Sequence, residues 1–140
     1  KSQKSIIKLF QSTNNIGSTP EFYALGYIYD EEDNNERAEY YYNKAIENDP
    51  NGENNITAYV HYRLAICCKS GDERIEGIKN AIEINPQYSK ISFKLGYFYI
   101  LRRDFANATK EHNALIALGA SKEAATLDKG IKAFQGLQGY

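Results

Sequence analysis

The stretch Phe22–Tyr29, FYALGYIY, decides the fold of this chain. Phe22, Leu25, Gly26 and Tyr29 follow the i, i+3, i+4, i+7 spacing that places residues on one face of a helix. A glycine inside a helix costs about 1 kcal/mol relative to alanine. Gly26 is therefore expected where a second helix presses against the backbone of the first.

The residues that follow supply this second helix. Ala38 and Ala45 are seven positions apart, which places two small side chains on one helical face. Pro50 then ends the helix, because proline cannot continue the backbone hydrogen bonds. Residues 22–50 therefore predict two antiparallel helices packed at close range.

The same arrangement recurs along the chain. Leu25, Leu64 and Leu95 each precede a small residue, and they are separated by 39 and 31 positions. Pro50 and Pro86, which close successive units, are 36 positions apart. A repeat of about 35 residues is typical of stacked helical hairpins. We therefore predict an all-α solenoid.

Residues 19–50 resemble the tetratricopeptide repeat, with a large residue, Leu-Gly, Tyr, then Ala, Tyr, Ala and a closing Pro at the offsets of that family. The resemblance covers residues 19–120 and implies a right-handed α-α superhelix of antiparallel helix pairs. We predict one domain over residues 1–140. Its parts are an N-terminal helix at 3–12, repeats at 19–52, 55–87 and 88–120, and a capping helix at 121–138. The helix at 3–12 is either a cap or the end of an earlier repeat.

Local signals predict where the helices begin. Ser18 and Glu21 have the spacing of a capping box. Asp72, Asp104 and Ser121 are predicted to cap three later helices. The predicted helices span about 19–30, 35–48, 55–69, 72–85, 88–102, 104–118 and 121–137. The turn near residue 70 is shorter than in the family, and Arg74 stands where the family has alanine.

Composition limits the classes of partner. The net charge is −1, which argues against a polyanion bound over the whole surface. Residues 1–56 hold five Lys/Arg and ten Asp/Glu, whereas residues 57–140 hold twelve and eight. The acidic first half disfavours nucleic acid. No stretch is long and apolar enough to predict insertion into a membrane.

Cys67 and Cys68 are the only cysteines, and they are adjacent. Because a disulfide between neighbouring helical residues has poor geometry, we expect two free thiols. The lack of a disulfide framework favours the cytoplasm, although export stays open because a removed signal peptide would leave no trace.

The sequence offers little for catalysis. His61 and His112 lie in different repeats without a partner at ligand spacing, and both occupy core-type positions. There is no phosphate-binding glycine loop, and the single cysteine pair does not make a zinc site. We predict no enzyme activity, no cofactor and no metal.

The resemblance to the tetratricopeptide family implies a concave groove lined by the second, fifth, ninth and twelfth residues of each first helix. These positions are Pro20, Tyr23, Tyr27 and Asp30, then Tyr59, Tyr62, Ile66 and Lys69, then Lys90, Phe93, Tyr97 and Ile100. The periodicity agrees, because Tyr23 and Tyr27 lie off the packing face of their helix. Tyrosine combines a large contact area with a hydroxyl group, which is typical of residues that anchor interfaces.

Cations accompany these aromatic residues. The family's clamp for a C-terminal carboxylate uses residues in the first repeat that are tyrosines here, but Arg63, Lys90 and Lys94 stand at or near its later positions. These cations are suited to an acidic group on a ligand. The predicted partner-binding residues are Tyr23, Tyr27, Tyr59, Tyr62, Arg63, Ile66, Lys90, Phe93, Lys94 and Tyr97.

The sequence favours a non-catalytic protein-interaction module, an adaptor that binds a peptide or a partner helix in a tyrosine-lined groove. The alternative is a structural scaffold or a self-associating segment, or a fragment of a longer repeat array. RNA binding by stacked aromatic side chains and cations is a third reading, disfavoured by the charge distribution.

Overall fold

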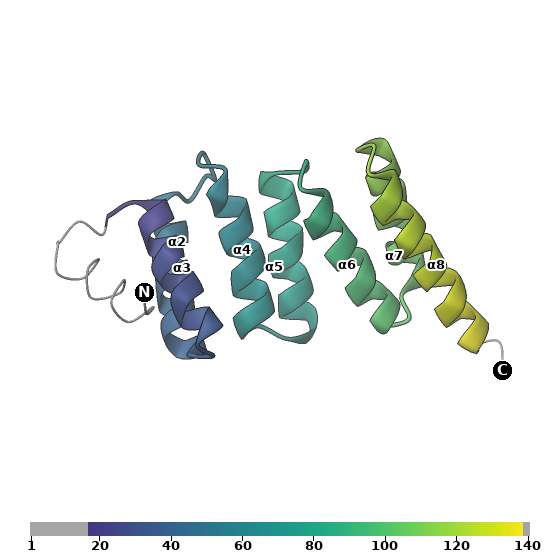
Figure 1. Ribbon diagram of the computed structural model, residues 1–140, viewed down its shortest axis with the longest axis horizontal. Helices are drawn as coiled ribbons and strands as arrows, with labels where there is room; N and C mark the ends of the chain where they lie inside the picture. Colours follow the sequence, from purple (N-terminus) through teal and green to yellow (C-terminus); the bar gives the residue numbers. More distant parts are fainter. Residues whose placement is uncertain (1–16, 139–140) are drawn as a thin grey trace. The chain divides into compact units, whose positions relative to one another are not determined.

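The computed structural model describes residues 17–138, so the helix predicted at 3–12 lies outside the described residues. Within this range the chain is entirely α-helical, and helices that are neighbours in sequence pack pairwise, as in a helical repeat protein (Figure 1). The helices are α2 (Thr19–Glu31), α3 (Asn35–Asn48), α4 (Ile56–Cys68), α5 (Gly71–Ile84), α6 (Ser89–Leu101), α7 (Phe105–Ala117) and α8 (Ser121–Gln138). The chain divides into an N-terminal unit, residues 1–84, and a C-terminal unit, residues 85–140.

Helix α2 begins where its sequence predicts. The Ser18 side chain accepts a hydrogen bond from the backbone nitrogen of Glu21 at 3.4 Å. The Glu21 carboxylate accepts in return from the backbone nitrogen of Ser18 at 3.0 Å. Two donors that the helix itself leaves unpaired are thereby satisfied, and the predicted capping box is confirmed.

Gly26 marks the closest approach of α2 and α3. A Cβ atom added at Gly26 would lie 2.5 Å from the ring of Tyr42. Tyr42 is fully buried, as are Ala38 and Ala45 on the same face of α3. The prediction that a second helix presses on Gly26 is confirmed, but the contact is made by an aromatic ring rather than by a small residue.

The α2–α3 and α6–α7 hairpins close with the same turn. Asn34 and Asp104 each donate a backbone hydrogen bond of 2.9 Å to the carbonyl five residues earlier. The residues before them, Asp33 and Arg103, have positive φ angles of 59° and 62°. Asn34 and Asp104 then cap α3 and α7 with their side chains. The turns of the two hairpins therefore have the same hydrogen bonds and the same backbone geometry.

The α4–α5 hairpin is built differently. Only Lys69 and Ser70 separate the two helices, and Lys69 has an extended backbone. Helix α5 begins at Gly71, whose positive φ of 56° suits glycine. Asp72 therefore lies inside α5, and its predicted role as the preceding cap is wrong. The short turn starts the helix two residues earlier than a cap at Asp72 would require.

Arg74 replaces the missing turn. Its Nε donates to the carbonyls of Ala65 and Lys69 at 3.3 and 3.0 Å, and its Nη2 donates to that of Ile66 at 3.1 Å. These carbonyls lie at and just beyond the end of α4, where a helix leaves carbonyls unpaired, although that of Ala65 also accepts from the backbone nitrogen of Lys69 at 3.3 Å. Arg74 therefore serves as a side-chain cap, which explains why alanine does not occupy this position.

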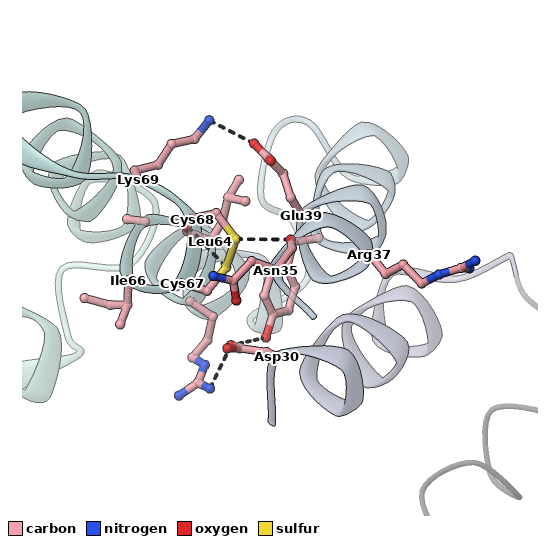
Figure 2. Close-up of a disulfide and its surroundings, with 12 residues drawn as sticks. Asp30, Asn35, Arg37, Glu39, Leu64, Ile66, Cys67, Cys68 and Lys69 are labelled. Atoms are coloured by element: carbon pink, nitrogen blue, oxygen red, sulfur yellow. Dashed lines mark hydrogen bonds and ion pairs between the residues drawn. A yellow bond between two sulfur atoms is a disulfide. The ribbon is translucent and has the colours of Figure 1, made fainter. Parts of the chain in front are cut away.

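The cysteines are not free thiols. Cys67 and Cys68 are bonded through their sulfur atoms, with Cα atoms 3.8 Å apart (Figure 2). The expectation of free thiols assumed that both residues lie within a continuing helix. The pair instead occupies the last two residues of α4, directly before the extended Lys69.

In the C-terminal unit, α6 pairs with α7 and α8 packs on both. The sequence predicts an apolar stripe on α8 at Ala124, Leu127, Ile131 and Phe134; the first three are buried, and Phe134 is partly buried. Leu127 reaches α6 at Gly96, where an added Cβ would lie 2.6 Å from its side chain. Ser121, predicted as a preceding cap, is instead the first residue of α8.

Among the described helices, none has the length and apolar character needed to cross a bilayer.

Candidate functional site

Five tyrosines of the N-terminal unit form one connected set of rings, here called the tyrosine cluster. They come from three helices: Tyr23 and Tyr27 from α2, Tyr42 from α3, and Tyr59 and Tyr62 from α4. The ring centroid of Tyr23 lies 6.0, 6.0 and 5.9 Å from those of Tyr27, Tyr42 and Tyr59, and Tyr59 lies 5.7 Å from Tyr62. The structure therefore brings together the four tyrosines predicted for this part of the groove.

The members of the tyrosine cluster differ in exposure. Tyr42 is fully buried and forms its base, whereas Tyr23, Tyr59 and Tyr62 are partly buried. Tyr27 is 38% exposed and presents its ring to solvent. The cluster thus has a fixed base and an accessible edge, as a contact surface for a partner requires.

A charged network adjoins the tyrosine cluster. Asp30, at the end of α2, accepts a hydrogen bond from the Tyr42 hydroxyl at 2.9 Å. The same carboxylate forms an ion pair with Arg63 Nη2 at 2.8 Å. The guanidinium carbon of Arg63 lies 5.1 Å from the centre of the Tyr27 ring. Arg63 therefore joins the predicted set spatially, but its charge is already balanced by a carboxylate of this chain.

Burial changes the acidity of the cluster. It raises the pKa of Tyr23 to about 12, with a further contribution from the neighbouring Tyr59. Burial also raises the pKa of Tyr42 and of Tyr62. The three hydroxyl groups stay protonated well above neutral pH, so they remain hydrogen-bond donors.

Ile66 completes the set predicted on α4. It lies one helical turn beyond Tyr62 and is partly buried. Its carbonyl oxygen accepts the hydrogen bond from Arg74 Nη2. Ile66 thus connects the predicted binding residues of α4 with Arg74, the side-chain cap of that helix.

The C-terminal unit contains a separate pocket, here called the α6–α8 pocket. Its volume is about 320 Å³, and its walls come from two helices. Phe93, Lys94, Tyr97 and Ile100 of α6 form one wall, and Thr126, Leu127 and Gly130 of α8 form the other. Three of the predicted binding residues, Phe93, Lys94 and Tyr97, therefore line the α6–α8 pocket. The contribution of α8 to this pocket was not predicted from the sequence.

The rim of the α6–α8 pocket is cationic. The ammonium group of Lys94 lies 5.9 Å from the centre of the Tyr97 ring, and Tyr97 is 44% exposed. Lys90, one turn before Lys94, is also exposed. Residues 85–140 hold eight Lys/Arg against four Asp/Glu. An acidic group beside an apolar one would complement this surface.

His61 lines a different hollow, between α4 and α5. The hollow has a volume of about 260 Å³, and its lining also includes Lys69, Glu73 and Glu76. Burial lowers the pKa of His61, so the imidazole is held in its neutral form. Across the described residues, no three His, Cys, Asp or Glu side chains are grouped as a metal would require.

Two contributions to these surfaces were missed in the sequence. Nothing in the sequence singles out the Tyr42 hydroxyl, which donates a hydrogen bond to Asp30. The wall of α8 was missed because that helix was predicted only as a cap. Thr126 and Gly130, one turn apart and both small, were the available signal.

Comparison with known proteins agrees with this architecture. A family model described as a tetratricopeptide repeat matches residues 22–51. No curated protein sequence matches the chain. The matched residues coincide with the α2–α3 hairpin, and the described residues continue as further helical hairpins. The matched repeat and the all-helical architecture of the described residues fit a tetratricopeptide-repeat protein.

Proposed function

We propose that this chain is a non-catalytic interaction module that binds an extended peptide or a partner helix. The tyrosine cluster and the α6–α8 pocket are the proposed contact surfaces. The observation that carries the proposal is the tyrosine cluster itself, in which rings from α2 and α4 meet over the buried Tyr42. Proteins with tetratricopeptide repeats generally bind other proteins.

The physical properties of the tyrosine cluster support this role. Its rings are held in place by one another, so little conformational entropy is lost when a partner covers them. Each exposed ring offers apolar area and a hydroxyl group to the partner. The Arg63–Asp30 pair fixes Tyr27 through the cation above its ring. Such prearranged aromatic residues are typical of the few positions that dominate binding energy.

The α6–α8 pocket supports a second point of contact. Phe93, Ile100 and Leu127 offer an apolar lining, and Lys94 stands at the rim. We propose that it accepts an apolar side chain of the partner, with a neighbouring acidic group facing the lysines. Because Arg63 is already paired with Asp30, Lys90 and Lys94 are the better candidates for this acidic contact.

The proposal can be tested by affinity capture. The chain would be used as bait in a lysate of its source organism, beside a Tyr27→Ala/Tyr97→Ala variant. These are the two exposed rings of the predicted set, so their removal should leave the fold intact. We expect the wild-type chain to retain a protein that the variant loses, which mass spectrometry would identify. Loss of one dominant anchor typically lowers affinity by 2 kcal/mol or more, about thirtyfold.

A matched control comes from α3. Tyr40 is 55% exposed but lies outside the predicted set. Tyr40→Ala should therefore retain the same partner as the wild type. Equal retention by all three baits would show that another surface binds, and loss by Tyr40→Ala alone would place the contact on α3. Circular dichroism of each variant would verify that helicity is unchanged.

Self-association is the alternative role, and light scattering separates it from partner binding. If the chain is the proposed partner-binding module, we expect light scattering to show a monomer across a range of concentrations. A stable dimer that Tyr27→Ala/Tyr97→Ala dissociates would assign the same rings to contacts between copies of this chain.

A further inference from the structure

The bonded cysteines occupy a distinctive position at the end of α4. Figure 2 shows the bonded sulfur atoms facing the start of α3, where Cys68 contacts Asn35. Cys68 Sγ lies 3.6 Å from the carbonyl oxygen of Asn35, and Cys67 Sγ lies 3.6 Å from that of Leu64. Both cysteine side chains are partly exposed. The pair is thus both accessible and in contact with a second helix.

Whether these two sulfur–oxygen contacts can be hydrogen bonds depends on the redox state of the cysteines. A disulfide sulfur has no hydrogen, so in the bonded form the contacts are not hydrogen bonds. A thiol carries a weak S–H donor. After reduction, Cys67 and Cys68 would each have a carbonyl oxygen within reach. The surroundings therefore supply a hydrogen-bond acceptor for each thiol of the reduced pair.

The end of α4 also tolerates both states. In a continuing helix, neighbouring side chains point about 100° apart, which keeps adjacent sulfur atoms separate. Here the helix stops at Cys68, and Lys69 is extended. Arg74 donates hydrogen bonds to the carbonyls of Ala65, Ile66 and Lys69. The ion pair of Lys69 with Glu39, at 3.1 Å, ties the same end to α3. None of these attachments is made by a sulfur atom, so opening the sulfur bond removes none of them directly.

We propose that Cys67 and Cys68 form a reversible thiol–disulfide exchange site for low-molecular-weight thiols of the glutathione type. A thiolate of the small thiol attacks one sulfur, forms a mixed disulfide and releases the other cysteine as a thiolate, which takes up a proton. A second small thiolate then attacks the sulfur of the first small thiol in the mixed disulfide. The second cysteine is released as a thiolate, which takes up a proton, and the two small thiols leave as one oxidised disulfide. Two small thiols are oxidised while one protein disulfide is reduced to two thiols.

The site is tested by equilibrating the full chain with mixtures of reduced and oxidised glutathione, then alkylating free thiols and measuring the mass. We expect both cysteines to be alkylated in excess reduced glutathione and neither in excess oxidised glutathione. The change should reverse on exchange of buffer, with unchanged helical circular dichroism. Alkylation of both cysteines at every ratio, or of neither at every ratio, would overturn the proposal. So would disulfide-linked dimers in place of the internal bond.

Two matched variants test the exchange step. In Cys67→Ser and Cys68→Ser the remaining thiol has no internal partner, while the serine hydroxyl can still donate to the nearby carbonyl oxygen. Each variant should accumulate one glutathione per chain under oxidising conditions and lose it on reduction. Folded variants that take up no glutathione would show that the sulfur atoms are not reached by the small thiol, and the site would be structural.

Discussion

Gly26 and Tyr42 show how one residue without a side chain sets the distance between two helices. The Tyr42 ring fills the space where a Cβ of residue 26 would stand, at 2.5 Å, and its hydroxyl is held by Asp30. Because that ring is buried and tethered, it cannot move aside freely. Gly26→Ala should therefore destabilise the protein by about 1–3 kcal/mol, as overpacking does. Urea denaturation followed by circular dichroism would measure the change.

Gly136 provides the control at the same scale. It lies in α8, is exposed, and an added Cβ would meet nothing within 4 Å. Gly136→Ala should stabilise the helix by about 0.5–1 kcal/mol, because alanine has the higher helix propensity. If both substitutions proved neutral, the close approach at Gly26 would not limit the packing of α2 and α3.

At the scale of the element, the end of α4 depends on a side chain of α5. Arg74 satisfies three carbonyls that a backbone turn satisfies elsewhere in the chain. Arg74→Ala would restore the residue typical of the family, yet it should destabilise the protein by about 1–3 kcal/mol. The carbonyls of Ile66 and Lys69 would lose their hydrogen bonds from Arg74, whereas that of Ala65 keeps the one from the backbone nitrogen of Lys69. Thermal unfolding of the variant would test this expectation.

Lys79 is the matched control for this prediction. It is an exposed cation on the same helix, and Lys79→Ala should change stability by no more than about 0.5 kcal/mol. A loss of equal size in both variants would indicate a general effect of charge on α5. An unaffected Arg74→Ala variant would mean that water replaces the cap at no cost.

At the scale of the whole molecule, the tyrosines link stability to alkaline pH. The pKa of Tyr23 is raised to about 12, and burial raises the pKa of Tyr42 and Tyr62 as well. Below pH 10 these phenols are protonated in both states, so their contribution to stability is complete. Between about pH 10 and 12 the unfolded chain loses its protons first, so stability should fall as pH rises. Urea midpoints measured across this range would test the sign.

Tyr23→Phe isolates one contribution to this pH dependence. The variant keeps the ring but removes the ionising hydroxyl, so its stability should fall less steeply above pH 10. An equally steep fall would assign the effect to other groups. The measurement also reports on the integrity of the tyrosine cluster, because a solvent-exposed tyrosine would show no raised pKa.

The sequence predicted more about single elements than about how they combine. The start of α2, the full extent of α3 and the apolar stripe of α8 agree with the structure, and the family match covers residues 22–51. The division into repeats and the single domain over residues 1–140 stay predictions. The predicted binding residues stay predictions as well, although the structure groups most of them into two surfaces.

By itself, the sequence determined the helical repeat, because its signals lie within a few residues of one another. Capping residues, small residues at the close approach and helical periodicity act through local hydrogen bonds and spacing. The tertiary structure alone decided the Tyr42–Asp30–Arg63 network, the capping of α4 by Arg74, and the second wall of the α6–α8 pocket. These depend on side chains from different helices, whose distances are set only when the helices pack. The bond between Cys67 and Cys68 belongs with them, because the place where α4 ends determines whether adjacent sulfur atoms can meet.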